Sequence, residues 1–204
     1  VARHGLEVER LSAAAASDRF PFRIPADMEA IVEPTGGYLL VEACVQAQLD
    51  AARELGATWI QERVEDWEVS GTGVAVKTAS GTYRCQQLVV CQGAWSTSLL
   101  GAIGCPLQIL QKHQYWFEAT EEATDQLPIY FFETELGDFY GFPNISGAGL
   151  KVAQHGGGCP RERPFDLTRA RDPEDLRQVE QFMTRHLDFG YGKLLNQKAC
   201  MYTM

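Results

Sequence analysis

The chain has 204 residues, of which 45% are hydrophobic, enough to fill the core of one large domain or of one and a half small ones. Asp and Glu outnumber Lys and Arg by 27 to 18, and the basic residues are scattered, which argues against nucleic acid as a partner. No apolar run approaches the ~20 residues of a membrane span, and the first residues lack the apolar core of a signal peptide, so we expect a cytoplasmic protein without a membrane partner.

The six cysteines are spread along the chain without a Cys-x-x-Cys pair, which is typical of reduced thiols rather than of a disulfide framework. The first residue is Val1 instead of Met, and the last residue lies within a predicted strand. Both ends indicate a fragment of a longer protein.

The first half of the chain predicts loops, one long helix and a small meander. Residues 1–36 contain a short helical segment around Leu11–Ala16, but three prolines and weak periodicity favour loop elsewhere. Apolar residues recur at helical spacing between residues 40 and 55, and Gly56 follows as a stop. Residues 57–63 read as a strand, residues 64–85 as a β-meander, and residues 88–91 as a buried strand.

The second half predicts a separate sheet. A short helix at 95–103 precedes a region rich in aromatic and β-branched residues, from 107 to 155, which predicts three or four antiparallel strands. Asp172 and Pro173 predict a helix start, because Asp can cap free N–H groups and Pro suits the first helical position. This helix is expected to run to about Leu187, with a strand returning at 198–203.

The hairpin at residues 139–155 places three polar side chains together. A period of two puts Lys151 and His155 on the same face of its second strand, and Tyr140, just before the turn, can lie opposite them. A cation, an imidazole and a phenol on one face cost desolvation free energy unless they meet solvent or a ligand. The pattern alone fits an ordinary solvated sheet face as well as a site.

Three segments together resemble the sarcosine oxidase family of FAD-dependent amine oxidases. Tyr140–His155, with Tyr-Gly-Phe-Pro, a glycine-rich turn and Gly-Leu-Lys, is similar to the family's substrate-domain hairpin. Leu88–Ser96 resembles the strand and Gly-Ala-Trp turn beside the cofactor, and Ala199–Thr203 resembles the segment whose Cys carries the flavin. They come in the family's order and at about its spacing.

The resemblance implies an α+β fold: a substrate-domain antiparallel sheet flanked by helices, plus part of an FAD-binding α/β domain with the meander. The expected parts are an entry segment at 1–36, the FAD-binding part at 37–104, the substrate sheet at 105–199, and the start of a return to the FAD domain at 200–204. The Gly-x-Gly-x-x-Gly fingerprint of dinucleotide binding is absent from the chain. In the family it precedes the position that aligns with Val1.

The resemblance also implies roles for individual residues near the amine. Lys151 matches the lysine beneath the flavin that activates oxygen, an electrostatic role suited to a buried ammonium. Tyr140 and His155 match residues that line the amine pocket and orient the substrate. Residues 111–113, Gln-Lys-His, lie near a point where relatives often have Arg, so the charge of the pocket stays open.

Five further residues match cofactor contacts. Cys200 matches the thiol that attacks a ring methyl carbon of FAD and forms a thioether, although a free Cys is otherwise a small buried hydrophobe. Val64 matches a backbone contact to the adenine, and Gly93, Ala94 and Trp95 match the turn near the ribose and flavin. Trp95 is equally suited to core packing.

The implied function is oxidation of the C–N bond of a secondary or N-methyl amino acid to an imine, with reduction of O2 to H2O2. Its partners would be a small-molecule amine or amino acid and O2, and the chain alone is expected to be inactive. The alternative is a non-catalytic truncated or stand-alone β-sheet domain that binds a small amine or a protein partner. No metal site is expected, because His155 and Cys159 offer only two ligands.

Overall fold

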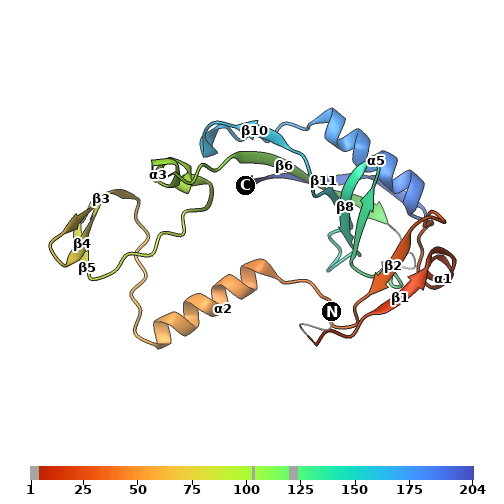
Figure 1. Ribbon diagram of the computed structural model, residues 1–204, viewed down its shortest axis with the longest axis horizontal. Coiled ribbons are helices and arrows are strands. Elements are labelled where there is room, and N and C mark those ends of the chain that lie inside the picture. Colours follow the sequence, from red (N-terminus) through yellow and green to blue (C-terminus); the bar gives the residue numbers. More distant parts are fainter. Residues whose placement is uncertain (1–4, 103, 120–123) are drawn as a thin grey trace. The chain divides into compact units, whose positions relative to one another are not determined.

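The computed structural model describes residues 5–102, 104–119 and 124–204 of the chain. Two compact units are present: one joins the residues up to Gly37 to Gly93–Met204, and the other is Tyr38–Gln92 (Figure 1). No helix in the described ranges is long and apolar enough to cross a membrane.

The larger unit is built on a six-stranded antiparallel sheet, so the predicted antiparallel sheet is confirmed and is larger than expected. The strands β7, β8, β9 and β6 are neighbours in that order, while β11 pairs with β6 along its whole length. The strands β9 and β10 share the other edge of β6, at opposite ends. The bounds are β6 Ile109–Ala119, β7 Tyr130–Thr134, β8 Gly137–Phe142, β9 Leu150–Gln154, β10 Cys159–Arg161 and β11 Tyr191–Thr203.

The predicted hairpin is confirmed as β8 and β9, with Tyr140 opposite Ala153 and Phe142 opposite Lys151. The Asn144 side chain closes the turn by accepting a hydrogen bond from the Gly149 N–H at 2.9 Å. Gly149 has a φ of +94°, and a Cβ there would lie 2.7 Å from the Phe117 carbonyl oxygen. The turn therefore needs glycine both for its backbone conformation and for its approach to β6.

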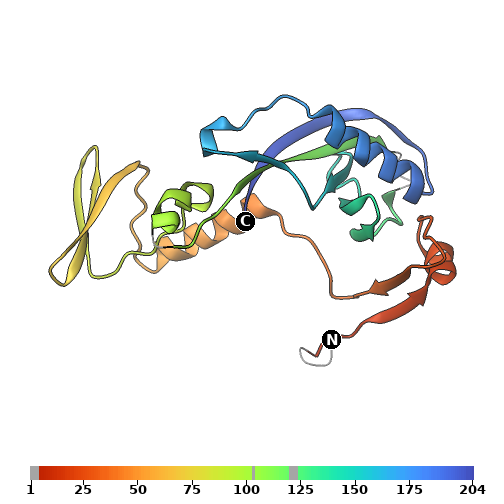
Figure 2. The same cartoon turned by 45° about the horizontal axis from the view of Figure 1, so that its top comes forward.

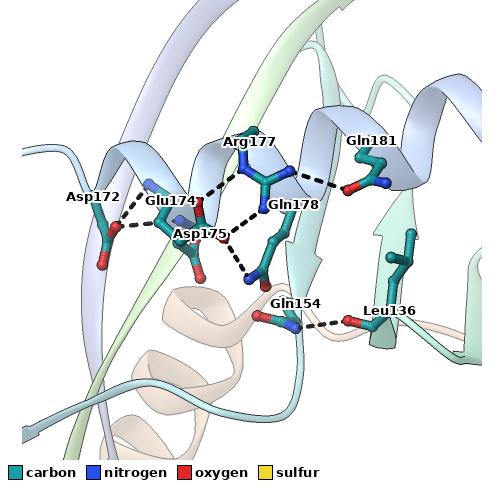
Figure 3. A network of polar contacts seen from close by, with 8 residues as sticks. All are labelled: Leu136, Gln154, Asp172, Glu174, Asp175, Arg177, Gln178 and Gln181. Atoms are coloured by element: carbon teal, nitrogen blue, oxygen red, sulfur yellow. Dashed lines mark hydrogen bonds and ion pairs between the residues drawn. The ribbon is translucent and has the colours of Figure 1, made fainter.

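Helix α5, Pro173–His186, lies across one face of this sheet (Figures 1 and 2). As predicted, the Asp172 side chain caps it by accepting hydrogen bonds from the N–H groups of Glu174 and Asp175. On its outer face Arg177 pairs with Glu174, and Gln154 of β9 donates to the Leu136 carbonyl nearby (Figure 3). The Asp172 cap thus fixes where the helix begins.

The core of the larger unit lies between α5 and the sheet. The Phe182 ring stacks on Phe139, with centroids 4.4 Å apart and planes 8° apart. Phe22, from the N-terminal segment, packs edge-on against Tyr130 and Phe132. The sheet face toward α5 is thus filled mainly by aromatic and aliphatic side chains, with the buried Gln111 and His113 of β6 beside them. The remaining fully buried members are Tyr115, Phe117, Leu150, Val152, Val179, Met183 and Leu187.

The N-terminal segment is more ordered than the sequence indicates. It forms β1 (Glu9–Ser12), α1 (Ala13–Arg19) and β2 (Glu29–Val32), where mostly loop was predicted. The strands β1 and β2 pair with each other, so each supplies the backbone partners that the other needs. A pairing of two four-residue strands leaves little periodicity for a sequence to show.

The unit Tyr38–Gln92 contains helix α2, Val41–Glu54, and the meander β3 (Val64–Ser70), β4 (Gly73–Thr78) and β5 (Gly81–Cys85). The predicted helix between residues 40 and 55 and the predicted β-meander at 64–85 are confirmed. The predicted strands at 57–63 and 88–91 are wrong: these segments have no strand partner among the described residues and are largely exposed, with Val89 83% exposed. An extended segment becomes a strand only where a neighbour pairs its backbone groups.

The predicted short helix at 95–103 is present in the larger unit as a 3-10 turn, η2 (Gly93–Ser96), followed by α3 (Thr97–Ala102). Residue 103, the last of the predicted range, lies outside the described residues. The turn η2 packs against β11.

Candidate functional site

The sheet face opposite α5 carries a group of polar and aromatic side chains, which we call the site face. Directly opposed residues of antiparallel strands project to the same side of a sheet. Lys112 lies opposite Cys200, Gln114 opposite Lys198, and Trp116 opposite Lys151. The site face comprises Lys112, Gln114, Trp116, Tyr140, Phe142, Lys151, Ala153, His155, Lys198, Cys200 and Tyr202.

The Lys151 ammonium is surrounded by three aromatic rings. Its Nζ lies 5.0 Å from the ring centroid of Phe142, 5.3 Å from that of Trp116 and 5.8 Å from that of Tyr140. A cation over aromatic faces is stabilised by about 0.5–2 kcal/mol per favourable contact. Burial lowers the pKa of Lys151, while the sulfur of Cys200 opposes this effect. The rings therefore hold a half-buried positive charge on the sheet without a carboxylate among these contacts.

Tyr140 and His155 lie beside Lys151, so the predicted common face is confirmed. The His155 ring meets Tyr140 at 6.2 Å, Tyr202 at 5.8 Å and Phe131 at 5.5 Å between centroids, each edge-on. The Tyr140 hydroxyl accepts a hydrogen bond from Gln114 Nε2 at 3.4 Å. Burial, together with the neighbouring Tyr202 phenol, raises the pKa of Tyr140 far above its usual range. The Tyr140 phenol thus keeps its proton at any physiological pH.

Cys200 lies on the same face, in β11. Its thiol is half-buried, and Gln114 Nε2 approaches Sγ at 3.8 Å. Burial raises the pKa of the Cys200 thiol, and the ammonium groups of Lys151 and Lys112 act in the opposite direction. All six cysteines are free thiols.

Sequence reasoning assigned no role to the three members of the site face that lie in β6: Lys112, Gln114 and Trp116. Lys112 is only 2% exposed, and its Nζ donates a hydrogen bond to the Gly156 carbonyl. Alternation along any strand in the predicted region 107–155 places Gln114 and Trp116 on the same side, so the sequence already indicated that they share a face. Only the pairing between β6 and β9 shows that this side of β6 is the one that carries Lys151.

The other predicted cofactor contacts lie elsewhere. Gly93, Ala94 and Trp95 form η2, where Ala94 is buried and the Trp95 ring packs edge-on against Phe165 at 5.9 Å. Because η2 packs against β11, this turn is near the strand that holds Cys200. Val64 begins β3 in the unit Tyr38–Gln92, with its side chain partly exposed. Across the described ranges, no three His, Cys, Asp or Glu side chains gather as metal ligands would.

The residues of the site face fit a flavin by their chemistry. A thiol beside ammonium groups can ionise and bond to an electrophilic carbon, as a covalently held flavin requires. A half-buried ammonium would supply positive charge beside a bound flavin, where it favours negative charge on a reacting group. A phenol and an imidazole next to that ammonium supply hydrogen-bonding groups for a small polar substrate.

An antiparallel sheet that packs a helix on one face presents these groups on its other face, and their chemistry is compatible with the class of flavin-dependent oxidoreductases. The model of the DAO family, FAD dependent oxidoreductases, matches residues 1–204. The chain belongs to this family.

Related sequences narrow the comparison. The chain is 35% identical to a monomeric sarcosine oxidase from Bacillus sp. (strain NS-129), in a match that covers 98% of the chain and 54% of that protein. It is 31% identical to an N-methyl-L-tryptophan oxidase from Citrobacter koseri, over 97% of the chain and 54% of the relative. The chain therefore spans about half the length of these relatives.

Solved structures share the fold. NikD, an amino acid oxidase essential for nikkomycin biosynthesis, superposes in its open form with a TM-score of 0.78 at 23% identity, covering 100% of the chain and 55% of NikD. Glycine oxidase from Bacillus cereus superposes with a TM-score of 0.72 at 18% identity, covering 99% of the chain and 53% of that enzyme.

Proposed function

We propose that this chain supplies the amine-binding face of a sarcosine oxidase-like enzyme, which oxidises the C–N bond of a secondary or N-methyl amino acid. The amine would lose two electrons and two protons to become an imine, and O2 would receive them as H2O2. The observation that carries the proposal is the gathering of Lys151, Tyr140, His155 and Cys200 on one sheet face. The similarity to monomeric sarcosine oxidases and to N-methyl-L-tryptophan oxidase supports it.

The site face offers two groups toward a bound cofactor. FAD, when bound, would accept the two electrons that the amine loses and would pass them to O2. Cys200 would hold it covalently through a thioether, since its thiol is half-buried on the face and lies near two ammonium groups. Lys151 would stabilise negative charge on the reacting oxygen, because three rings fix its ammonium in a partly desolvated position.

Tyr140 and His155 would orient the amine. The Tyr140 phenol keeps its proton, so it can donate a hydrogen bond to a substrate while accepting one from Gln114. A positive charge at Lys151, a few ångströms away, disfavours a second cation and thus favours the neutral amine, whose lone pair the oxidation needs.

Because the chain spans about half of its relatives, the reaction would be that of a longer polypeptide, with the dinucleotide fingerprint supplied outside residues 1–204. Contacts of Val64, Gly93, Ala94 and Trp95 with the cofactor, and a cytoplasmic location, stay predictions. The competing hypothesis is a non-catalytic sheet domain that binds a small amine or a protein partner.

The test combines colour with peroxide production. A chimaera in which residues 1–204 replace the matching half of the Bacillus monomeric sarcosine oxidase would contain all segments of the family. We expect a yellow protein whose colour stays in the pellet after acid precipitation, and peroxide release with sarcosine, N-methyl-L-tryptophan or pipecolate. A folded chimaera that takes up FAD but produces no peroxide with any secondary amine would favour the non-catalytic hypothesis.

A further inference from the structure

Lys112 is a buried cation that has no individual role in the proposed reaction. It is among the largest fully buried side chains, and its Nζ donates to the Gly156 carbonyl. Its stem passes over Gly158, where a Cβ would lie 2.7 Å from Lys112 Cδ. Within the described ranges, no ion pair of 4.0 Å or less joins Lys112 to a carboxylate. Burial lowers the pKa of Lys112, while the charge of Asp175 and then that of the Cys200 sulfur act in the opposite direction. Both groups are therefore negative partners of this buried ammonium.

The residue directly opposite Lys112 in the sheet is Cys200. Side chains of directly opposed residues lie side by side, with Cβ atoms typically about 4.5–5.5 Å apart. The Gln114 amide, also in β6, approaches the Cys200 sulfur at 3.8 Å. Gln114 thus presents an N–H donor to the thiol, whereas the Lys112 ammonium, bonded to the Gly156 carbonyl, acts on the thiol through its charge. Both favour the ionised form of the thiol.

The other charged and titratable groups around Cys200 come from three further elements. Lys151 of β9 contributes a second cation, and Asp175 of α5 contributes an opposing negative charge from the far side of the sheet. Tyr140 of β8 and Tyr202 of β11 keep their protons, because burial raises the pKa of both phenols. His155 lies beyond Tyr202, against its ring. Lys112 is therefore the cation of this group that is paired with Cys200 by strand register.

We propose that Lys112 is a positioning residue that stabilises the Cys200 thiolate, and so prepares this sulfur for bond formation with an electrophilic carbon. The step is the loss of the thiol proton to solvent, which leaves the bonding electron pair on sulfur. Lys112 acts together with Lys151, whose aromatic surroundings fix it for the oxygen chemistry. The inference rests on the proposed function insofar as the flavin is the natural electrophile.

The test measures the ionisation of Cys200 without any flavin. The 204-residue chain is treated with iodoacetamide between pH 6 and pH 10, so that the thiolate displaces iodide and forms a stable thioether. Cys200 is followed by mass spectrometry in the tryptic peptide that begins at Ala199. The exposed thiols Cys91, Cys105 and Cys159 report in the same samples as internal references.

Two variants separate charge from hydrogen bonding. Lys112→Gln removes the charge and keeps an N–H donor for the Gly156 carbonyl, whereas Lys112→Met removes both. We expect each to raise the apparent pKa of the Cys200 thiol by roughly 0.5–1 unit, which slows its alkylation about three- to ten-fold below that pKa. Lys193→Met makes an equal charge change at an exposed position of β11. It should leave the pH dependence of Cys200 alkylation unchanged.

The inference would be overturned if the pH dependence of Cys200 alkylation were the same in Lys112→Gln and in the unmutated chain. Lys112 would then serve only the Gly156 hydrogen bond. An equal shift of the reference thiols would overturn it as well, because the effect would then not be specific to Cys200. Thermal unfolding, followed by circular dichroism, identifies a variant that has lost its fold. If one of the two Lys112 variants is unfolded, the other one tests the inference. Flavin retention is read from the colour of an acid pellet, so failure of covalent attachment and failure of thiolate stabilisation are separate results.

Discussion

Replacing Lys151 by Met should separate the two halves of the proposed reaction. Methionine keeps most of the apolar stem among the three rings but removes the ammonium, which lies 5.0–5.8 Å from their centroids. For a half-buried charge about 4–5 Å from developing negative charge, at an effective dielectric constant of about 20, the lost stabilisation is about 3–4 kcal/mol. That corresponds to a reoxidation of reduced flavin by O2 that is about 10²–10³-fold slower.

The assay is stopped-flow absorbance on a flavin-loaded protein that carries residues 1–204. Anaerobic mixing with a secondary amine gives the rate of flavin reduction, which should change far less than the rate measured on mixing the reduced protein with O2. Lys193→Met, at an exposed position of β11, serves as a control for net charge. Equal reoxidation rates in Lys151→Met and the unmutated protein would remove Lys151 from the oxygen step, and an equal loss in both half-reactions would indicate a structural role.

Other residues give three further predictions. Cys200→Ala should move the flavin from the acid pellet to the supernatant; flavin already free in the unmutated, denatured protein would contradict attachment at Cys200. Phe182→Ala should lower the free energy of unfolding by about 3–5 kcal/mol in urea, because this fully buried ring stacks on Phe139, whereas Glu180→Ala on the exposed side of α5 should change it by less than about 0.5 kcal/mol. Burial lowers the pKa of His186, so the unfolded chain binds its proton more readily; stability should fall as pH drops from about 7 through the unfolded value near 6.5, and His186→Gln should flatten that slope.

Local signals explain which elements the sequence predicted. Helix α5 begins where Asp172 caps it and Pro173 occupies its first turn, and these are properties of adjacent residues. The hairpin β8–β9 likewise depends on a turn that Asn144 and Gly149 close within six residues. The wrong predictions concern strands at 57–63 and 88–91, where apolar composition favours strand but no described neighbour pairs with the backbone. Strand formation depends on the partner as much as on the segment.

The sequence by itself determined the common face of Lys151 and His155, because alternation along one strand is a local rule. It also carried the family resemblance, which the comparisons confirm. Only the tertiary structure decided that Lys112 lies opposite Cys200 and that Trp116 covers Lys151. The register between strands far apart in the chain depends on how β6 meets β9 and β11, and a shift by one residue would turn each of these side chains to the face that α5 covers.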